Sequence, residues 1–351
     1  MYTRRTYKAI ELAMWTRFDT LKFFSIILVW VSIYYFLDLE WLKIPWTPIA
    51  LIGTAVAFII GFQNNAAYDR IWEARKIWGG IVNTSRTFGM FIQDMLTNEY
   101  ADSKKSEQAI QEEVKTLTYR HIAWMTALRH AMRSPKQWET TVNQKTNQEW
   151  AISPPEKKSN LDDDLKPYLS KEDADSILSK DNKQTALLYQ QSHHLRRLKE
   201  SGMIWEFSFL ELEGLLQELF SLQGKSERIK NFPYPRQFAT LNHYFMWILL
   251  LLLPVAMVPQ FAEIGRGISA NYPQLGDLFI WISVPIYTAI GWIFHTMERI
   301  GRTGENPFEG TSNDVPISTI ARGIEIDLRQ NLGEAKEDIP AQFPADYNVQ
   351  F

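Results

Sequence analysis

The clearest repeat of side chains that could act on an ion lies between positions 54 and 62. Thr54, Phe58 and Phe62 recur every four residues, with glycine or alanine at several positions between them. In a helix this spacing places the three side chains on one stripe, and small neighbours let other helices approach closely. Copies of such a helix around an axis would form rings of phenylalanine, a constriction that closes by excluding water. An apolar stripe that packs on neighbouring helices explains the same spacing.

Polar side chains directly follow this stripe. They are Asn64, Asn65, Asp69 and Glu73. Amide and carboxylate groups could meet an ion that leaves the constriction, because rings of such groups set selectivity in many pores. A solvated or ion-paired helix surface is the alternative explanation for these charges.

Other reactive patterns are missing from the sequence. The chain has no cysteine, which excludes disulfides, thiol catalysis and thiolate metal sites. It has no glycine-rich phosphate loop, nucleophile elbow or HExxH motif. The six histidines are scattered, although His243 and His295 border apolar segments, where they either anchor a membrane interface or face water. Because these motifs are missing, the sequence predicts no enzyme, no cofactor and no metal. Its net charge of -3 gives no sign of a nucleic-acid-binding protein.

Four apolar segments must position the stripe, at 23–37, 48–62, 238–258 and 278–294. A membrane-spanning helix needs about 20 mostly apolar residues, and flanking tryptophans can extend the two shorter segments. Pro254 and Pro285 lie inside the last two, so neighbouring groups must satisfy the carbonyls that they free. The sequence predicts a packed bundle of two transmembrane hairpins, 23–63 and 238–296. Four buried helices of a soluble domain are the alternative.

Basic residues precede the first apolar segment and follow the second and the fourth. They include Arg17, Lys22, Arg75, Lys76 and Arg299. Because basic flanks stay in the cytosol, we expect a multi-pass protein of the plasma (inner) membrane. Its N-terminal segment 1–22, its middle region 64–237 and its C-terminal region 297–351 would then be cytosolic.

The predicted cytosolic regions have mostly helical patterns. Helices are expected over 64–95, as a continuation of the second span, over 186–223, as two segments that meet near Gly202, and over 317–332. The stretch 134–181 has few aliphatic residues, a Pro-Pro pair and dense mixed charge. We expect it to be a solvated insertion with short helices.

Several motifs resemble the bestrophin family. The sequence GFQNNAAYDRIWEARKIWGGIVNTSR, at 61–86, looks like the bacterial bestrophin signature after the second membrane helix. ERIKNFPYP before the third span, and ENPFEGTSNDVPI with GIEIDL after the fourth, are similar to the family in order and spacing. The resemblance covers most of the chain outside 134–181.

The resemblance implies an all-α pentameric channel, with four transmembrane helices per subunit, a helical cytosolic domain and one central pore. It places Thr54, Phe58 and Phe62 in the pore neck, and Leu210 at a second, cytosolic aperture. A bulky aliphatic is more usual at the first position, so Thr54 would make the outer neck wetter. Animal bestrophins bind calcium through an acidic cluster after the NPF turn. Here Asn306 and Asp314 occupy degenerate positions of that clasp with few acidic neighbours, so no calcium site is expected.

The expected function is therefore passive conduction of chloride or other small anions by a homo-oligomer in a lipid bilayer. A monovalent-cation channel of the same fold is one alternative, because Asp69 and Glu73 lie beside Arg70, Arg75 and Lys76. A membrane scaffold or sensor with a vestigial pore is another, and the insertion at 134–181 is the feature that favours it.

Overall fold

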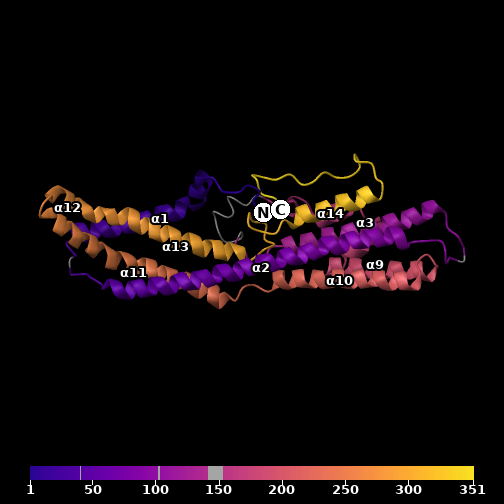
Figure 1. Cartoon of the computed structure of the whole chain (residues 1–351), viewed down its shortest axis with the longest axis horizontal. Helices are drawn as coiled ribbons and strands as arrows, with labels where there is room; N and C mark the ends of the chain where they lie inside the picture. The colour runs from indigo at the N-terminus through magenta and orange to yellow at the C-terminus, as the bar shows by residue number, and fades with distance from the viewer. Residues whose placement is uncertain (40, 102, 141–152) are drawn as a thin grey trace. The chain divides into compact units, whose positions relative to one another are not determined.

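The computed structural model describes residues 1–39, 41–101, 103–140 and 153–351 (Figure 1). These residues contain no β-strand, and isolated bridges join Tyr2 and Asp346 to Val349. The chain divides into two compact units. We call Arg4–Asp69 with Pro233–Glu305 the apolar unit, and Met1–Thr3, Arg70–Phe232 and Asn306–Phe351 the polar unit.

The apolar unit contains the membrane helices. Its elements are α1 (Ala9–Phe36), the first part of α2 (Trp46–Met95), α11 (Arg236–Ser269), α12 (Pro273–Phe279), the 3₁₀ turn η1 (Ile280–Ile282) and α13 (Ser283–Gly304). Four helical segments are long and apolar enough to cross a membrane, namely Ala9–Phe36, Trp46–Met95, Glu206–Ser269 and Pro273–Gly304. Each overlaps one predicted span, which confirms the all-α fold with four transmembrane helices.

The proline in α11 is accommodated as the sequence requires. Pro254 has no N–H, so the carbonyl of Leu250, four residues earlier, loses its helical partner. The Tyr287 hydroxyl of α13 donates to this carbonyl at 2.6 Å. Pro285 lies in the first turn of α13, where a missing N–H breaks no helical bond. The two prolines therefore fit a packed bundle.

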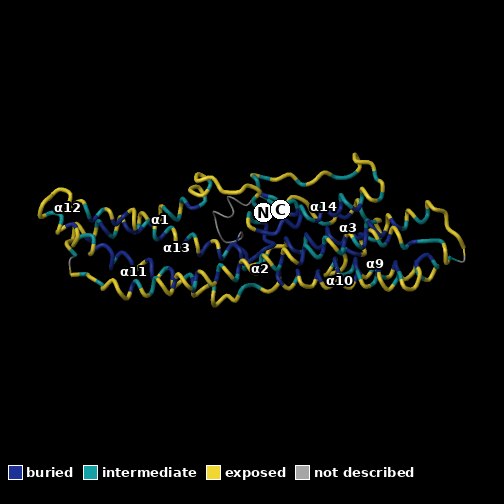
Figure 2. The backbone as a smooth tube through the Cα atoms, viewed as in Figure 1, coloured by how far each residue is buried: buried dark blue, intermediate teal, exposed yellow. Residues whose placement is uncertain are grey.

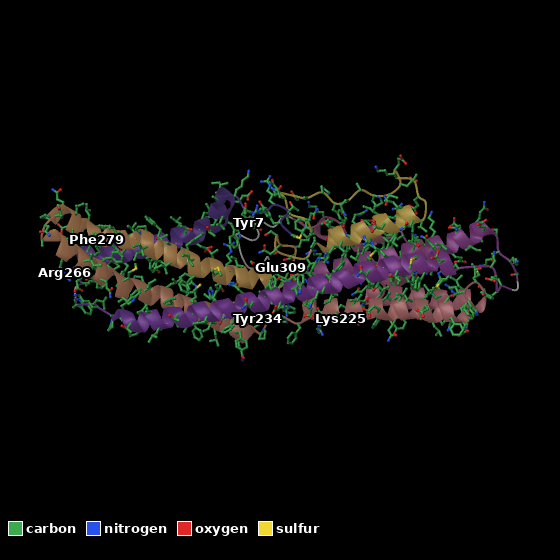
Figure 3. All side chains as sticks on the ribbon, in the orientation of Figure 1. Tyr7, Lys225, Tyr234, Arg266, Phe279 and Glu309 are labelled. Carbon is green, nitrogen blue, oxygen red and sulfur yellow. The ribbon has the colours of Figure 1, made fainter. Side chains whose placement is uncertain are left out.

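The α11–α12 turn brings two backbones close together. A Cβ atom added to Gly265 would lie 2.6 Å from the carbonyl oxygen of Gly276, so only glycine fits there. The rings of Phe261 and Phe279 stack beside this contact, with centroids 6.0 Å apart. Figure 3 labels Phe279 together with Arg266 at this end of the apolar unit.

The polar unit is a second helical bundle. It contains the rest of α2, then α3 (Glu107–Arg133), α6 (Pro155–Lys158), α7 (Leu161–Leu165), α8 (Lys171–Leu178), α9 (Lys183–Glu200), α10 (Glu206–Asn231) and α14 (Ile317–Asn331). The helix α2 is continuous over 50 residues, about 75 Å, as the sequence predicted. The break between α9 and α10 lies at Gly202, whose φ of +73° suits glycine.

The core of the polar unit is aromatic and aliphatic. Trp78, Phe88 and Trp124 are completely or almost completely buried, within a cluster that α2, α3, α9, α10 and α14 share. Figure 2 shows the buried segments of these helices in dark blue. The second half of α2 therefore serves as a core helix of this unit.

The stretch expected to be a solvated insertion is partly packed into the polar unit. Its residues 141–152 lie outside the described residues, and α6, α7 and α8 are the short helices that follow. Leu165 and Ile177 are buried in the core cluster. Glu156 is also buried. Its charge is compensated by Arg129 at 2.5 Å and by a hydrogen bond from Ser318 of α14 at 2.6 Å. Mixed charge here includes buried ion pairs as well as solvated groups.

Candidate ion pathway

The first part of α2 has one packed face and one exposed face. Phe58 and Phe62 are 65% and 69% exposed, and Thr54 is exposed on the same stripe. On the opposite side, Val56 and Ile60 are each 3% exposed. The structure therefore brings the three predicted neck residues together on a surface that the single chain leaves uncovered.

The exposed stripe is supported from behind by apolar packing at its first turns. Val56 and Ile60 belong to a cluster with Leu249 of α11, and a Cβ atom on Gly53 would lie 3.6 Å from a methyl group of Leu249. Thr54 donates its hydroxyl to the carbonyl of Ala50 at 2.9 Å. The hydroxyl oxygen of Thr54 can still accept a hydrogen bond, so the side chain is more polar than an aliphatic one.

The four polar residues after the stripe point in different directions. Asn65 and Asp69 are exposed and continue the stripe. Asn64 instead faces α13, since a Cβ atom on Gly301 would lie 2.5 Å from its Oδ1 atom. Glu73 lies in the polar unit and pairs with Arg228 of α10 at 2.5 Å. Of the four, Asn65 and Asp69 are the ones that share the face of the phenylalanines.

The predicted cytosolic aperture residue lies on α10. Leu210 is 57% exposed in the polar unit. Phe207, one turn earlier, is 62% exposed, and its ring meets Trp205 edge-on with centroids 4.8 Å apart. The start of α10 thus carries uncovered apolar side chains of its own.

The residues at the degenerate calcium-clasp positions are engaged with protein groups. Asp314 accepts a hydrogen bond from the Gly310 N–H and one from the Thr311 hydroxyl, each at 2.5 Å, and lies 3.5 Å from Arg133. Asn306 donates to Glu309 at 3.4 Å. Within the described residues, no three His, Asp or Glu side chains gather as metal ligands would.

A buried ionic cluster lies in the apolar unit, and its contacts between different helices could not be predicted from spacing, unlike the i,i+4 pair of Glu298 and Arg302. Glu298 of α13 accepts a hydrogen bond from Arg302 at 2.6 Å and lies 3.5 Å from Nδ1 of His243. Arg299 contacts Asp19 of α1 at 3.0 Å, and His295 lies 3.7 Å from the same carboxylate. The cluster joins α1, α11 and α13. The sequence signal was limited to ionisable residues at the borders of apolar segments.

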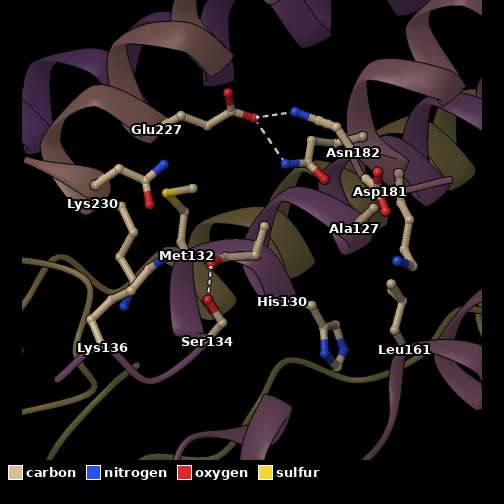
Figure 4. A pocket seen from close by; sticks show the side chains of 14 residues that line it. Ala127, His130, Met132, Ser134, Lys136, Leu161, Asp181, Asn182, Glu227 and Lys230 are labelled. Atoms are coloured by element: carbon tan, nitrogen blue, oxygen red, sulfur yellow. Dashed lines mark hydrogen bonds between the residues drawn. The ribbon is translucent and has the colours of Figure 1, made fainter.

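The polar unit contains a cavity of about 390 Å³ between α3, α9 and α10 (Figure 4). Its polar lining is largely paired internally. Glu227 accepts hydrogen bonds from Asn182 at 3.3 Å and from Gln184 at 2.8 Å, and His130 pairs with Asp164 at 2.8 Å. These lining side chains are therefore held by other protein groups.

Similar proteins share both sequence and fold with this chain. The family described as Bacterial/Fungal Bestrophin protein matches residues 6–269. The voltage-dependent anion channel-forming protein YneE of Escherichia coli K12 is 25% identical over 309 residues, 88% of this chain and 83% of that protein. Protein RSc3414 of Ralstonia nicotianae, which has the same description, is 25% identical over 288 residues, 82% of this chain and 78% of that protein.

A solved structure shows the same fold. The crystal structure of a bacterial bestrophin homologue from Klebsiella pneumoniae superposes with a TM-score of 0.70 at 20% identity, covering 91% of this chain and 98% of that one. Because the family match spans three quarters of the sequence and includes the exposed stripe of α2, the chain belongs to the bacterial and fungal bestrophin family.

Proposed function

We propose that the chain is the pore-forming subunit of a homopentameric anion channel in the plasma membrane, with both termini in the cytosol. The observation that carries this proposal is the uncovered stripe of Thr54, Phe58 and Phe62 on a membrane helix whose other face is packed. The relatives named as anion channel-forming proteins support it. The basic flanks of the spans support the orientation.

The composition of the exposed face favours contact with other subunits over contact with lipid alone. Ala55, Ala57 and Gly61 are exposed between the phenylalanines, and small residues let helices pack closely in a membrane. The stripe continues into Asn65 and Asp69, which lipid tails would not solvate. Around a central axis these residues would form a dry constriction that opens into a polar vestibule.

The reversal potential tests conduction and selectivity together. Purified protein in planar bilayers under a KCl gradient should give a potential near the chloride equilibrium value. Phe58→Ala and Phe62→Ala should increase conductance or leak, because they widen the constriction. Leu251→Ala is a matched control, since Leu251 is 57% exposed on another membrane helix of the same unit. If protein that is inserted into the bilayer carries no current, a scaffold or sensor role would be favoured instead.

A cation channel is the second candidate, and the exposed carboxylate of Asp69 favours it. This carboxylate follows Asn65 on the stripe, while the nearby Glu73 is paired with Arg228. A reversal potential near the potassium value would establish cation selectivity. In that case Asp69→Asn should move the potential toward zero, whereas an anion channel should become at most more anion-selective.

A further inference from the structure

Two neighbouring residues of α2 lie in opposite environments at the inner end of the stripe. Phe62 is 69% exposed, and Gln63 is 1% exposed. The amide of Gln63 is therefore directed into the helix bundle while the ring of Phe62 points away from it. Whatever fixes the rotation of α2 at Gln63 also fixes the direction of Phe62.

A continuous chain of hydrogen bonds holds Gln63. Asn242 of α11 donates its Nδ2–H to Oε1 of Gln63 at 3.0 Å. Gln63 donates its Nε2–H to Oε1 of Glu305 at 3.1 Å, and Arg236 donates to Oε2 of Glu305 at 2.8 Å. Both ends of the Gln63 amide are used, so its orientation is defined. Asn242 and Glu305 are 5% and 1% exposed.

This inner end is held differently from the first turns of the stripe. Behind Phe58, α2 packs through Val56 and Ile60, and apolar contacts have no preferred direction. At Gln63, a rotation of the helix would leave the buried Gln63 amide without its partners and would remove one of the hydrogen bonds to the buried Glu305 carboxylate, which is unfavourable. The close approach of Asn64 to Gly301 adds a steric limit on the same turn.

We propose that Gln63 is the positioning residue of the inner neck, and that its bonds to Asn242 and Glu305 hold Phe62 in the constriction. This inference rests on the proposed channel function, and it assigns a role to residues that the periodicity of the stripe does not include. Gln63 acts through Phe62 and has no contact with the ion. Loss of its bonds should free the inner ring of the neck and leave the ring of Phe58 in place.

The first test is a double-mutant cycle on channel opening. Gln63→Leu removes both hydrogen bonds at similar side-chain size and should raise the open-to-closed ratio on the order of tenfold. In a Phe62→Ala background the same change should add little, because the side chain through which Gln63 acts is gone. Thr288→Val is the control, since its hydroxyl bonds within α13 and joins no two helices. Equal effects of Gln63→Leu with and without Phe62 would overturn the proposal.

The second test needs no current, so it separates this inference from the channel function. The chain has no cysteine, so Phe62→Cys and Phe58→Cys each introduce a single thiol for modification by a methanethiosulfonate reagent. Adding Gln63→Leu should change the modification rate at position 62 several-fold and leave that at 58 nearly unchanged. An unchanged rate at 62 contradicts the proposal even if wild-type protein conducts. If Gln63→Leu does not assemble, Asn242→Leu removes one bond from α11 and should give a smaller change with the same pattern.

Discussion

The apolar unit leaves more of its large apolar side chains uncovered than the polar unit does. In the polar unit, Trp78 and Trp124 are 0% and 1% exposed. In the apolar unit, Phe58, Leu251 and Ile293 are 65%, 57% and 51% exposed. A water-soluble surface does not carry so many uncovered apolar residues on adjoining helices. The difference shows that the surface of the apolar unit suits a membrane better than water.

The units also differ in what holds their helices together. In the polar unit, a buried ion pair between Arg129 of α3 and Glu156 of α6 joins two segments of the chain. The apolar unit also has buried ion pairs, such as Arg299 with Asp19, but most of its buried contacts are aliphatic and aromatic, and its helices approach closely at glycines such as Gly265. Removal of a buried charge should therefore damage the polar unit, and added bulk at a helix contact should damage the apolar unit.

Removal of Glu156 should have the largest effect on stability. Glu156→Ala leaves the buried side chains of Arg129 and Arg133 without their shared carboxylate. Breaking a buried ion pair in this way costs about 3–5 kcal/mol, so the thermal midpoint in detergent should fall steeply. Asp162→Ala is the control, because Asp162 is exposed and lies 3.8 Å from the exposed Lys166. Equal thermal midpoints for the two variants would show that the buried ion pairs of Glu156 do not stabilise the polar unit.

Added bulk at a helix contact should have the next largest effect. Gly265→Ala places a Cβ atom 2.6 Å from the carbonyl oxygen of Gly276, whereas a Cβ atom on Gly267, in the same helix, meets nothing within 4 Å. Overpacking costs about 1–3 kcal/mol, while Gly267→Ala should be neutral or stabilising by up to about 1 kcal/mol. Thermal midpoints of the detergent-solubilised protein compare the two. The same midpoint for both would contradict close backbone packing at the α11–α12 turn.

The pH dependence of stability tests whether a histidine in the core of the polar unit is shielded from water. His121 is packed between Phe88 and Trp124, and burial lowers its pKa to about 3. Between pH 6.5 and 3 the unfolded chain binds a proton that the folded chain does not, so stability falls as the pH falls in this window. From pH 6.5 to 5 the loss is about 2 kcal/mol. His121→Phe should flatten this part of the pH profile of the thermal midpoint, and an unchanged slope would refute the assignment.

The smallest effect is expected at an exposed ion pair of the polar unit. Arg86 and Asp327 meet at 2.6 Å, but their side chains are 57% and 37% exposed. Exposed pairs contribute about 0–1 kcal/mol, so Asp327→Asn should shift the thermal midpoint slightly, and less in high salt. A loss as large as that of Glu156→Ala would show that burial is not what separates strong pairs from weak ones here.

Much of the fold could be predicted from local pattern. Helical spacing with no proline between Asn64 and Met95 predicted that α2 continues beyond its span, as it does. Four-residue spacing also predicted that Thr54, Phe58 and Phe62 share one stripe. The division of Asn64 from Asn65 needed the structure, because only the packing of α13 decides which amide turns inward.

Contacts between distant segments could not be predicted. Tyr287 caps the carbonyl freed by Pro254, yet the sequence shows only that some partner is needed. Gln63 lies 179 and 242 residues from Asn242 and Glu305, and no spacing rule joins them. Glu156 lies in a stretch whose composition favours solvation, and its burial follows from arginines on α3. Such pairs depend on how the helices pack, and the spacing of residues in one sequence does not reveal this packing.

Solvent access along α2 tests the central claim, that its exposed stripe lines an ion pathway, most directly. Single cysteines at 54, 58, 62 and 65 would be probed with a charged methanethiosulfonate reagent in bilayers while current is recorded, with Leu251→Cys as an exposed apolar control on α11. The account predicts that modification at the four stripe positions changes the current and that modification at 251 does not. No current change along the stripe, or a change at 251 as large as those at the stripe positions, would contradict the account.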